Sequence, residues 1–214
     1  MEAEESRAEE AYRKLEERIV TLDLKPGTSI TESRLADALD MGRTPVREAV
    51  QRLALEGLLV IRPRLGIVVS DINPADFARL LDARHALEVL LAGASARLAG
   101  RDERDALTSC AEAMKHAAAG GDARAFMRRD KEFDEIVAIA ACNPYAARAA
   151  APLQTHSRRF WFRYFAESDL NSAALHHMDL MAAIASGKPE AASEKADELM
   201  RYLCRQAASL IAAA

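Results

Sequence analysis

Residues 43–59 have the sequence RTPVREAVQRLALEGLL, and this stretch decides how the first part of the chain folds. Val46, Val50 and Leu53 recur at the spacing of an α-helix, so they predict one apolar face that packs on a core. Pro45 predicts the beginning of the helix, because the N–H that proline lacks has no partner in a first turn. The opposite face carries the polar residues Arg43, Thr44, Arg47 and Gln51.

The segments on either side of this helix predict a small domain. Residues 9–22 have apolar side chains at helical spacing, and Thr31 is placed to cap a short helix over TESRLADAL. After Gly57, two short runs rich in β-branched residues, LLVIRP and GIVVS, predict a hairpin. Helix, helix, turn, helix and hairpin is the order of a winged helix-turn-helix, which we expect over residues 1–70.

The strand signals end after residue 70, and only helical patterns follow. Short breaks with turn or capping chemistry, such as GGD, CNP and SGKP, separate six expected helices. Their expected ranges are 74–99, 102–119, 122–141, 144–166, 169–186 and 189–213. We therefore predict a mainly α fold, with an all-α bundle over residues 74–214 that senses an effector and dimerises. Residues 71–78 contain the linker from the first domain and the start of the first bundle helix.

Composition restricts the class of protein. The 214 residues carry a formal net charge of −4, which does not by itself indicate a nucleic-acid partner. The N-terminus MEAEESRAEE lacks the apolar centre of a signal peptide, and no apolar run approaches the roughly 18 residues of a membrane span. We expect a cytoplasmic protein without a membrane partner. The widely spaced Cys110, Cys142 and Cys204 favour small reduced thiols, with a redox sensor as the alternative.

The charge around the quoted helix is opposite in sign to that of the whole chain. Residues 43–66 contain five arginines and two glutamates, a local charge of +3. Arginine matches the O6 and N7 acceptors of guanine in the major groove, and threonine is suited to phosphate. Arg34 before this helix, and Arg62 and Arg64 in the hairpin, extend the basic surface. We predict DNA binding; the alternative is a solvated helix with scattered arginines.

The stretch PGTSITESRLADALDMGRTPVREAVQRLALEGLLVIRPRLGIVV resembles the DNA-binding domain of the GntR family of bacterial transcription regulators. The family usually has a serine where this chain has Gly42, which removes one phosphate contact. The resemblance implies that Arg64 lies where the wing reaches the minor groove and that Gly66 is the glycine of the wing tip. The expected DNA-binding residues are Arg34, Arg43, Thr44, Arg47, Gln51, Arg64 and Gly66.

Several helices of the second part place ionisable residues on their apolar faces. Arg84, for example, lies on a leucine-rich face, with Glu88 one turn later. Burying an unpaired charge is costly, so such groups pair, bind a metal or line a wet cavity. We predict a polar ligand pocket, although each residue alone is as compatible with a satisfied core or surface group. The candidate effector-binding residues are Arg84, Asp130, Asp134, His156 and His177.

The resemblance extends into this second part. DARHALEVLLAGASARLA, DKEFD, ACNPY and HHMDLMAAIASGKPEAA resemble segments of FadR-type GntR regulators, whose second domain is a helical ligand-sensing bundle of the FCD type. The resemblance implies a role for Arg84 in holding an effector carboxylate. It also implies a divalent metal bound by one aspartate and three histidines. Here Asp130 and His177 match that set, Asp134 replaces one histidine, and Leu199 falls at the position of the last.

Two hypotheses for this site remain open. In one, Asp130, Asp134 and His177 hold Zn, Ni or Mn together with water, as two carboxylates and an imidazole can. In the other, the pocket contains no metal. Asp130 and Asp134 then receive an amine or hydroxyl groups, while Arg84 holds a carboxylate.

We therefore expect a ligand-responsive transcription regulator, in particular a repressor of a catabolic or transport operon. It would bind a palindromic operator as a homodimer and respond to a small organic acid, sugar acid or amino acid. One alternative is a metal-dependent hydrolase using Asp130, Asp134 and His177, and another is a helical scaffold that has lost DNA binding. No nucleophile motif, phosphate loop or dinucleotide fingerprint supports an enzyme.

Overall fold

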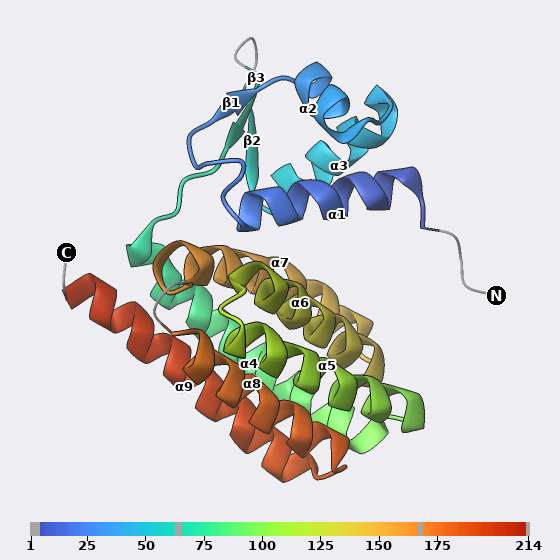
Figure 1. Cartoon of the computed structure of the whole chain (residues 1–214), viewed down its shortest axis with the longest axis vertical. Coiled ribbons are helices and arrows are strands. Elements are labelled where there is room, and N and C mark those ends of the chain that lie inside the picture. Colours follow the sequence, from blue (N-terminus) through green and yellow to red (C-terminus); the bar gives the residue numbers. More distant parts are fainter. Residues whose placement is uncertain (1–4, 63–65, 167–168, 213–214) are drawn as a thin grey trace. The chain divides into compact units, whose positions relative to one another are not determined.

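The computed structural model describes residues 5–62, 66–166 and 169–212 and divides the chain into two compact units, residues 1–72 and 73–214 (Figure 1). Both the mainly α fold class and the winged helix-turn-helix are confirmed. The elements of the first unit are α1 (Arg7–Val20), β1 (Ser29–Ile30), α2 (Glu32–Leu39), α3 (Arg43–Leu55), β2 (Leu59–Arg62) and β3 (Gly66–Val69).

Local chemistry explains where the helices of this unit begin. The Thr31 hydroxyl accepts a hydrogen bond from the backbone N–H of Arg34, so Thr31 caps α2 as predicted. Helix α3 begins at Arg43, two residues earlier than predicted, and Pro45 is its third residue. This position is still within the first turn, where the missing N–H of proline costs nothing.

The first unit contains a three-stranded sheet rather than the predicted hairpin alone. β2 and β3 form the hairpin, with Val60 opposite Val68, and β1 pairs with the other side of β3 in antiparallel orientation. β1 was missed because a two-residue strand is too short to show the alternation from which strands are predicted.

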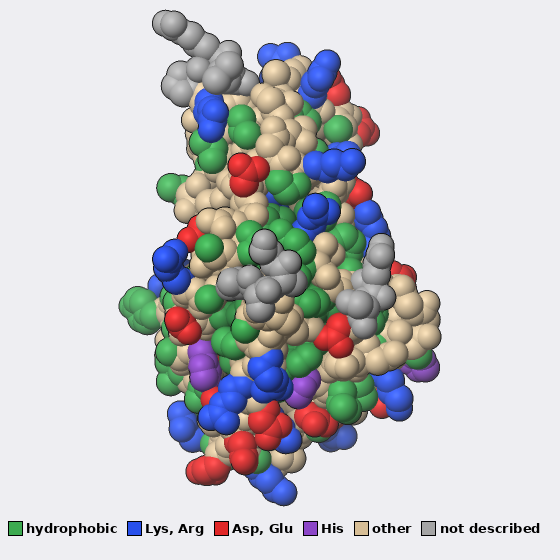
Figure 2. Space-filling view, turned by 90° about the vertical axis from the view of Figure 1, so that its left-hand side faces the viewer, with side chains coloured by type: hydrophobic (Ala, Val, Ile, Leu, Met, Phe, Trp, Pro, Cys, Tyr) green, Lys and Arg blue, Asp and Glu red, His purple; other side chains and the backbone are tan. Residues whose placement is uncertain are grey.

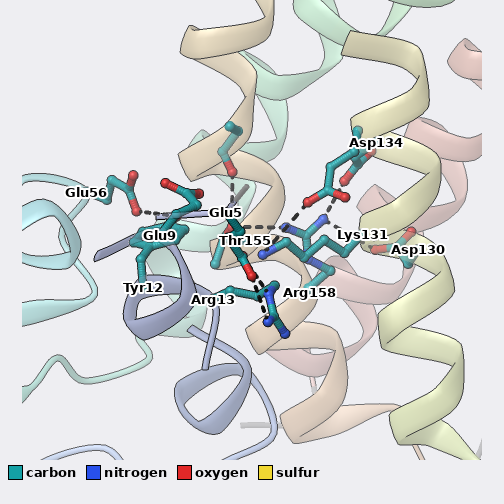
Figure 3. Close-up of polar contacts among 12 residues, drawn as sticks. Glu5, Glu9, Tyr12, Arg13, Glu56, Asp130, Lys131, Asp134, Thr155 and Arg158 are labelled. Atoms are coloured by element: carbon teal, nitrogen blue, oxygen red, sulfur yellow. Dashed lines mark hydrogen bonds and ion pairs between the residues drawn. The ribbon is translucent and has the colours of Figure 1, made fainter. Parts of the chain in front are cut away.

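The core of the first unit lies between α1, α3 and the sheet. Val46, Val50 and Leu53 are fully buried, which confirms the predicted apolar face of α3. Two side-chain contacts, one cation–π and one hydrogen bond, also join α1 to the end of α3. The Arg52 guanidinium lies 3.6 Å from the ring centroid of Tyr12, and the Tyr12 hydroxyl donates a 2.8 Å hydrogen bond to Glu56 (Figure 3).

The second unit is an all-α bundle. Its helices are α4 (Pro74–Leu98), α5 (Arg101–Ala119), α6 (Ala123–Ala140), α7 (Pro144–Tyr164), α8 (Leu170–Ala185) and α9 (Pro189–Ala212). Every predicted range is within two residues of the observed one, because Asn73, Asp122 and Asn143 cap three of these helices with their side chains. α4 packs along α9, and α5 packs against α6 and α8 (Figure 1).

No helix in the described ranges is long and apolar enough to cross a membrane. On the face drawn in Figure 2, basic and acidic side chains are interspersed rather than separated into large patches of one sign.

Candidate DNA-binding surface and buried polar cluster

The exposed side of α3 and the neighbouring end of α2 carry the predicted DNA-binding residues. Gly42 precedes α3 without a side-chain capping bond, so the N–H groups of the first turn remain available to an anion such as phosphate. This arrangement places basic and hydroxyl side chains beside free backbone donors. The exposed residues are Arg34, Arg43, Thr44, Arg47 and Gln51.

One residue of this surface has a protein partner that the sequence analysis missed. Arg47 donates hydrogen bonds from Nε and Nη2 to Oε2 of Glu32, at 3.1 and 3.0 Å. The pair ties the first turn of α2 to α3, yet the Arg47 side chain remains 58% exposed. Fifteen residues separate the partners, so only the angle between the two helices brings them together. Glu32 is therefore a further candidate residue of the DNA-binding surface.

The backbone conformation of Gly66, in the wing, explains why this residue is a glycine. Its φ is +88°, a left-handed conformation, and a Cβ added there would lie 2.9 Å from the backbone oxygen of Ile30. Gly66 is the first residue of β3 and is partly exposed. Its contact with DNA remains a prediction. Arg64, the other wing residue predicted to contact DNA, lies outside the described residues.

In the second unit, Arg84 belongs to a buried network between α4 and α7. It donates from Nε to Glu88 at 2.7 Å and from Nη1 to the Ser157 hydroxyl at 2.8 Å. Gln154 donates to the same Glu88 oxygen at 3.0 Å. The predicted inward position of Arg84 is therefore correct, and its charge is balanced within the protein. Ser157 and Gln154 were missed, although they lie nearly one turn apart on the same helix.

A second network joins α6, α7 and α8. His177 Nε2 lies 2.7 Å from Oδ1 of Asp130, and its Nδ1 lies 2.7 Å from the carbonyl oxygen of Ala173. Arg158 Nη1 contacts Oδ2 of Asp134 and lies 3.7 Å from Oδ2 of Asp130 (Figure 3). All four charged side chains are at least nine-tenths buried. Arg158 was absent from the sequence prediction.

Burial and mutual charge perturb these groups in different directions. Burial raises the pKa of Asp130, but the His177 charge, aided by Arg158, outweighs it and lowers that pKa to about 2. Burial and the neighbouring charge of Asp130 raise the pKa of Asp134 to about 8, against the opposing effect of Arg158. Burial lowers the pKa of His177, yet the Asp130 carboxylate more than compensates and the net shift is upward. Both ring nitrogens of His177 face acceptors, which also favours the imidazolium.

A cavity of about 20 Å³ lies where the two networks meet. That is room for about one water molecule. Of the five candidate effector-binding residues, Arg84, Asp130 and His177 line it, whereas Asp134 and His156 are not among its lining residues. His156 is only half-buried. The remaining walls are Phe126, Met127, Ser157, Arg158, Trp161, Ala173 and Leu203.

The residues present do not fit the divalent metal that the resemblance implies. No three His, Cys, Asp or Glu side chains within the described ranges come together as a ligand set. His177 Nε2 is engaged by Asp130, whereas a metal ligand must be an unprotonated imidazole. The Arg158 guanidinium moreover lies beside both carboxylates, where it supplies positive charge.

Comparison with known proteins agrees with this architecture. Residues 7–69 match the gntR family of bacterial regulatory proteins, and residues 79–202 match the FCD domain. A protein from Paenarthrobacter nicotinovorans, described as a probable D-xylose utilization operon transcriptional repressor, is 32% identical over 169 residues, which cover 78% of this chain and 73% of that relative.

Two further similarities are local or structural. An HTH-type transcriptional regulator of Streptomyces ambofaciens is 41% identical over 78 residues, but the match covers only 36% of this chain and 33% of that relative. E. coli McbR/YncC superposes with a TM-score of 0.82 at 19% identity, over 96% of this chain and 99% of that one, which shows a common fold. The chain belongs to the GntR family of bacterial regulatory proteins, with an FCD domain as its second unit, and is a DNA-binding transcription regulator rather than an enzyme.

Proposed function

We propose that the protein is a ligand-responsive repressor that binds a palindromic operator as a homodimer. The observation that carries the proposal is the exposed group formed by Arg43, Thr44 and Arg47 at the beginning of α3, beside uncapped backbone N–H groups. Guanidinium groups at this position are suited to guanine edges in the major groove, and the N–H groups are suited to phosphate. Repression is supported by the description of the Paenarthrobacter relative as a repressor.

The DNA-binding role is tested with Arg47→Ala. Duplexes selected from a random library by the full-length protein serve as operator, and affinity is measured by mobility shift. Losing one base-reading arginine should weaken operator binding by about 1–3 kcal/mol and relax sequence discrimination. Arg101→Ala, which removes a 92% exposed cation from the second unit, is the matched control and should bind like the wild type. Wild-type affinity in Arg47→Ala would refute the role of Arg47.

The small number of basic groups on one DNA-binding surface supports the proposed homodimer. One copy offers few basic groups, whereas two copies related by a two-fold axis double the number of phosphate contacts and match a palindromic site. Light scattering on the full chain should give about twice the 23.4 kDa chain mass. Selected operators should contain inverted half-sites about one helical turn apart. A monomer that binds single half-sites would contradict the proposal.

The effector proposed for the second unit is a small organic acid, sugar acid or amino acid. Arg84 offers a guanidinium group at the cavity, and Trp161 and Phe126 offer apolar walls. The cavity holds about one water molecule, so a metabolite must open the bundle as it binds. Such an opening would give the effector different affinities for two states of the protein, which is what coupling to the DNA-binding unit requires.

A charge-balanced variant tests the effector site. Arg84→Ala alone would leave Glu88 buried without its cation and unfold part of the bundle. Arg84→Met combined with Glu88→Gln removes both charges and keeps an acceptor for Gln154. Acids that raise the Tm of the wild type are first identified in a panel of sugar acids, organic acids and amino acids. The double variant should bind operator normally but require a much higher acid concentration for release; release at the wild-type concentration would exclude Arg84 from effector recognition.

A further inference from the structure

The Arg158 guanidinium lies in the part of the bundle where the resemblance to FCD domains implies a metal ion. It comes from α7, whereas the two carboxylates that it approaches, Asp130 and Asp134, lie one turn apart on α6 (Figure 3). Arg158 also donates from Nη2 to the Thr155 hydroxyl at 3.0 Å, which fixes the orientation of its planar group. The side chain is only 6% exposed.

The charges around this group explain why a cation is needed there. Two carboxyl groups one turn apart in a dry interior repel each other when both are ionised, because each has lost its hydration. His177 compensates Asp130 at 2.7 Å, and the Arg158 guanidinium is the positive charge that contacts Asp134. An arginine remains protonated under all ordinary conditions, so its charge is permanent and independent of solution metal.

We infer that Arg158 is a built-in counter-ion that replaces a bound divalent metal, so that the FCD domain of this chain folds and stays assembled without metal. The residues at the positions of the implied metal ligands also differ from that metal-binding set. Asp134 and Leu199 stand where the resemblance implies histidines, and His177 uses its Nε2 for Asp130. The inference is independent of the proposed effector and operator, because its readouts are metal content and stability rather than DNA release.

The inference predicts what happens when the guanidinium is removed. Arg158→Ala leaves Asp130 and Asp134 without their shared cation and opens space between α6 and α7. Two carboxylates and one imidazole are suitable donors for Mn²⁺ or Zn²⁺ once the side chains rearrange. A divalent ion should therefore restore part of the stability that the variant loses.

The experiment measures metal content by mass spectrometry, and Tm with EDTA, MnCl₂ or ZnCl₂, on full-length protein purified without a nickel resin. Wild type should contain no stoichiometric metal, and its Tm should not respond to any of the three additions. Arg158→Ala should melt roughly 10 °C lower and recover several degrees with Mn²⁺ or Zn²⁺. Arg148→Ala, which removes an exposed arginine from the same helix, should behave like the wild type.

Other results of these measurements would overturn the inference. About one metal ion per chain in the wild type, or a saturable rise of its Tm with Mn²⁺, overturns it. A wild-type Tm in Arg158→Ala, or a variant that no ion stabilises, also overturns it. If Arg158→Ala does not fold, Arg158→Met with Asp134→Asn supplies the answer, because this pair loses one cation and one carboxylate together. Folding of the double variant supports the counter-ion role, and its failure to fold overturns it.

Discussion

Arg47 projects from α3 with its guanidinium already held by Glu32. The two hydrogen bonds use Nε and Nη2 and leave Nη1 for another acceptor. A long side chain that is fixed before binding loses less conformational entropy when it reaches a base. An exposed ion pair of this kind contributes little to folding stability, so its value lies in orientation.

Glu32→Gln should therefore lower the preference for operator over scrambled DNA without changing stability by more than about 0.5 kcal/mol. The loss of a negative charge strengthens phosphate binding to any sequence, while a less oriented Arg47 weakens readout of the specific one. Mobility shifts on both DNAs give the ratio. Glu48→Gln, an exposed change of the same charge on α3, is the control. An unchanged ratio in Glu32→Gln would show that Arg47 needs no support from Glu32.

Asp134 gives a second prediction at this scale, which concerns pH. Its pKa is raised from 3.8 to about 8 by burial and by Asp130, so between these values the folded protein binds a proton that the unfolded chain has released. The stability contribution of this group is complete below about pH 4 and is lost as the pH rises through about 8, by at most about 1.4 kcal/mol per pH unit.

Urea unfolding from pH 5.5 to 8.5 should consequently show a shallower decline for Asp134→Asn than for the wild type. Asparagine keeps the shape but has no proton to release. The charged or titratable groups around Asp134, which both proteins retain, are Glu88, Arg84, Asp130, Arg158 and His177. Parallel profiles for the two proteins would contradict the raised pKa of Asp134.

For single residues, the sequence predicts which polar side chains are buried but not which partners they contact. Periodicity placed five polar residues on inward faces, and four of them, Arg84, Asp130, Asp134 and His177, are buried. The fifth, His156, is only half-buried. Periodicity cannot supply the partners, because Arg158 meets the carboxylates only through the packing of α7 against α6. The sequence signal for Arg158 is the pair of adjacent arginines that precedes an aromatic run at residues 158–162.

At the scale of elements, the helices were predictable because their ends carry local signals. Capping side chains such as Asn73 and turn glycines such as Gly57 act on neighbouring residues only, so the helix ends that they define can be predicted from the sequence. β1 has no such signal, since its two residues become a strand only by pairing with β3. The three-stranded sheet is therefore a tertiary result rather than a local one.

Gly66 and Gly42 provide a matched pair for testing this sheet. Gly66→Ala combines a φ of +88° with a Cβ only 2.9 Å from a backbone oxygen of β1, so it should destabilise the first unit by about 1–3 kcal/mol. Gly42→Ala meets only the Pro45 side chain, at 3.7 Å, and should cost less than about 1 kcal/mol. Urea denaturation followed by circular dichroism compares them; equal losses would show that the junction of β1 and β3 tolerates a side chain.

The whole molecule consists of two compact units, and one hydrophobic cluster consists entirely of residues from the first. A unit with its own core can lose stability without its neighbour doing so. The polar networks around Arg84 and Arg158 belong entirely to the second unit. Sequence reasoning distinguished the two units because strand signals end where the bundle begins.

Leu53→Ala should therefore affect one unit selectively. Leu53 is fully buried, and its truncation should cost about 2–5 kcal/mol in the first unit. Hydrogen exchange followed by mass spectrometry should become faster in α1, α2 and α3, while α5, α6 and α8 exchange as in the wild type. Leu55→Ala, a change at a 91% exposed position of the same helix, should leave all of them unchanged. Faster exchange throughout the bundle would mean that the units unfold together.

Trp161 in the wall of the small cavity has a practical consequence. It is the single tryptophan of the chain, is 4% exposed, and packs against Phe126 at 5.2 Å between ring centroids. Indole emission depends on the polarity and mobility of its surroundings, so the native protein already carries a fluorophore beside Arg158. A metabolite that opens the cavity should change its intensity or wavelength. Candidate effectors can thus be screened by intrinsic fluorescence, without a label, an operator or knowledge of the regulated genes.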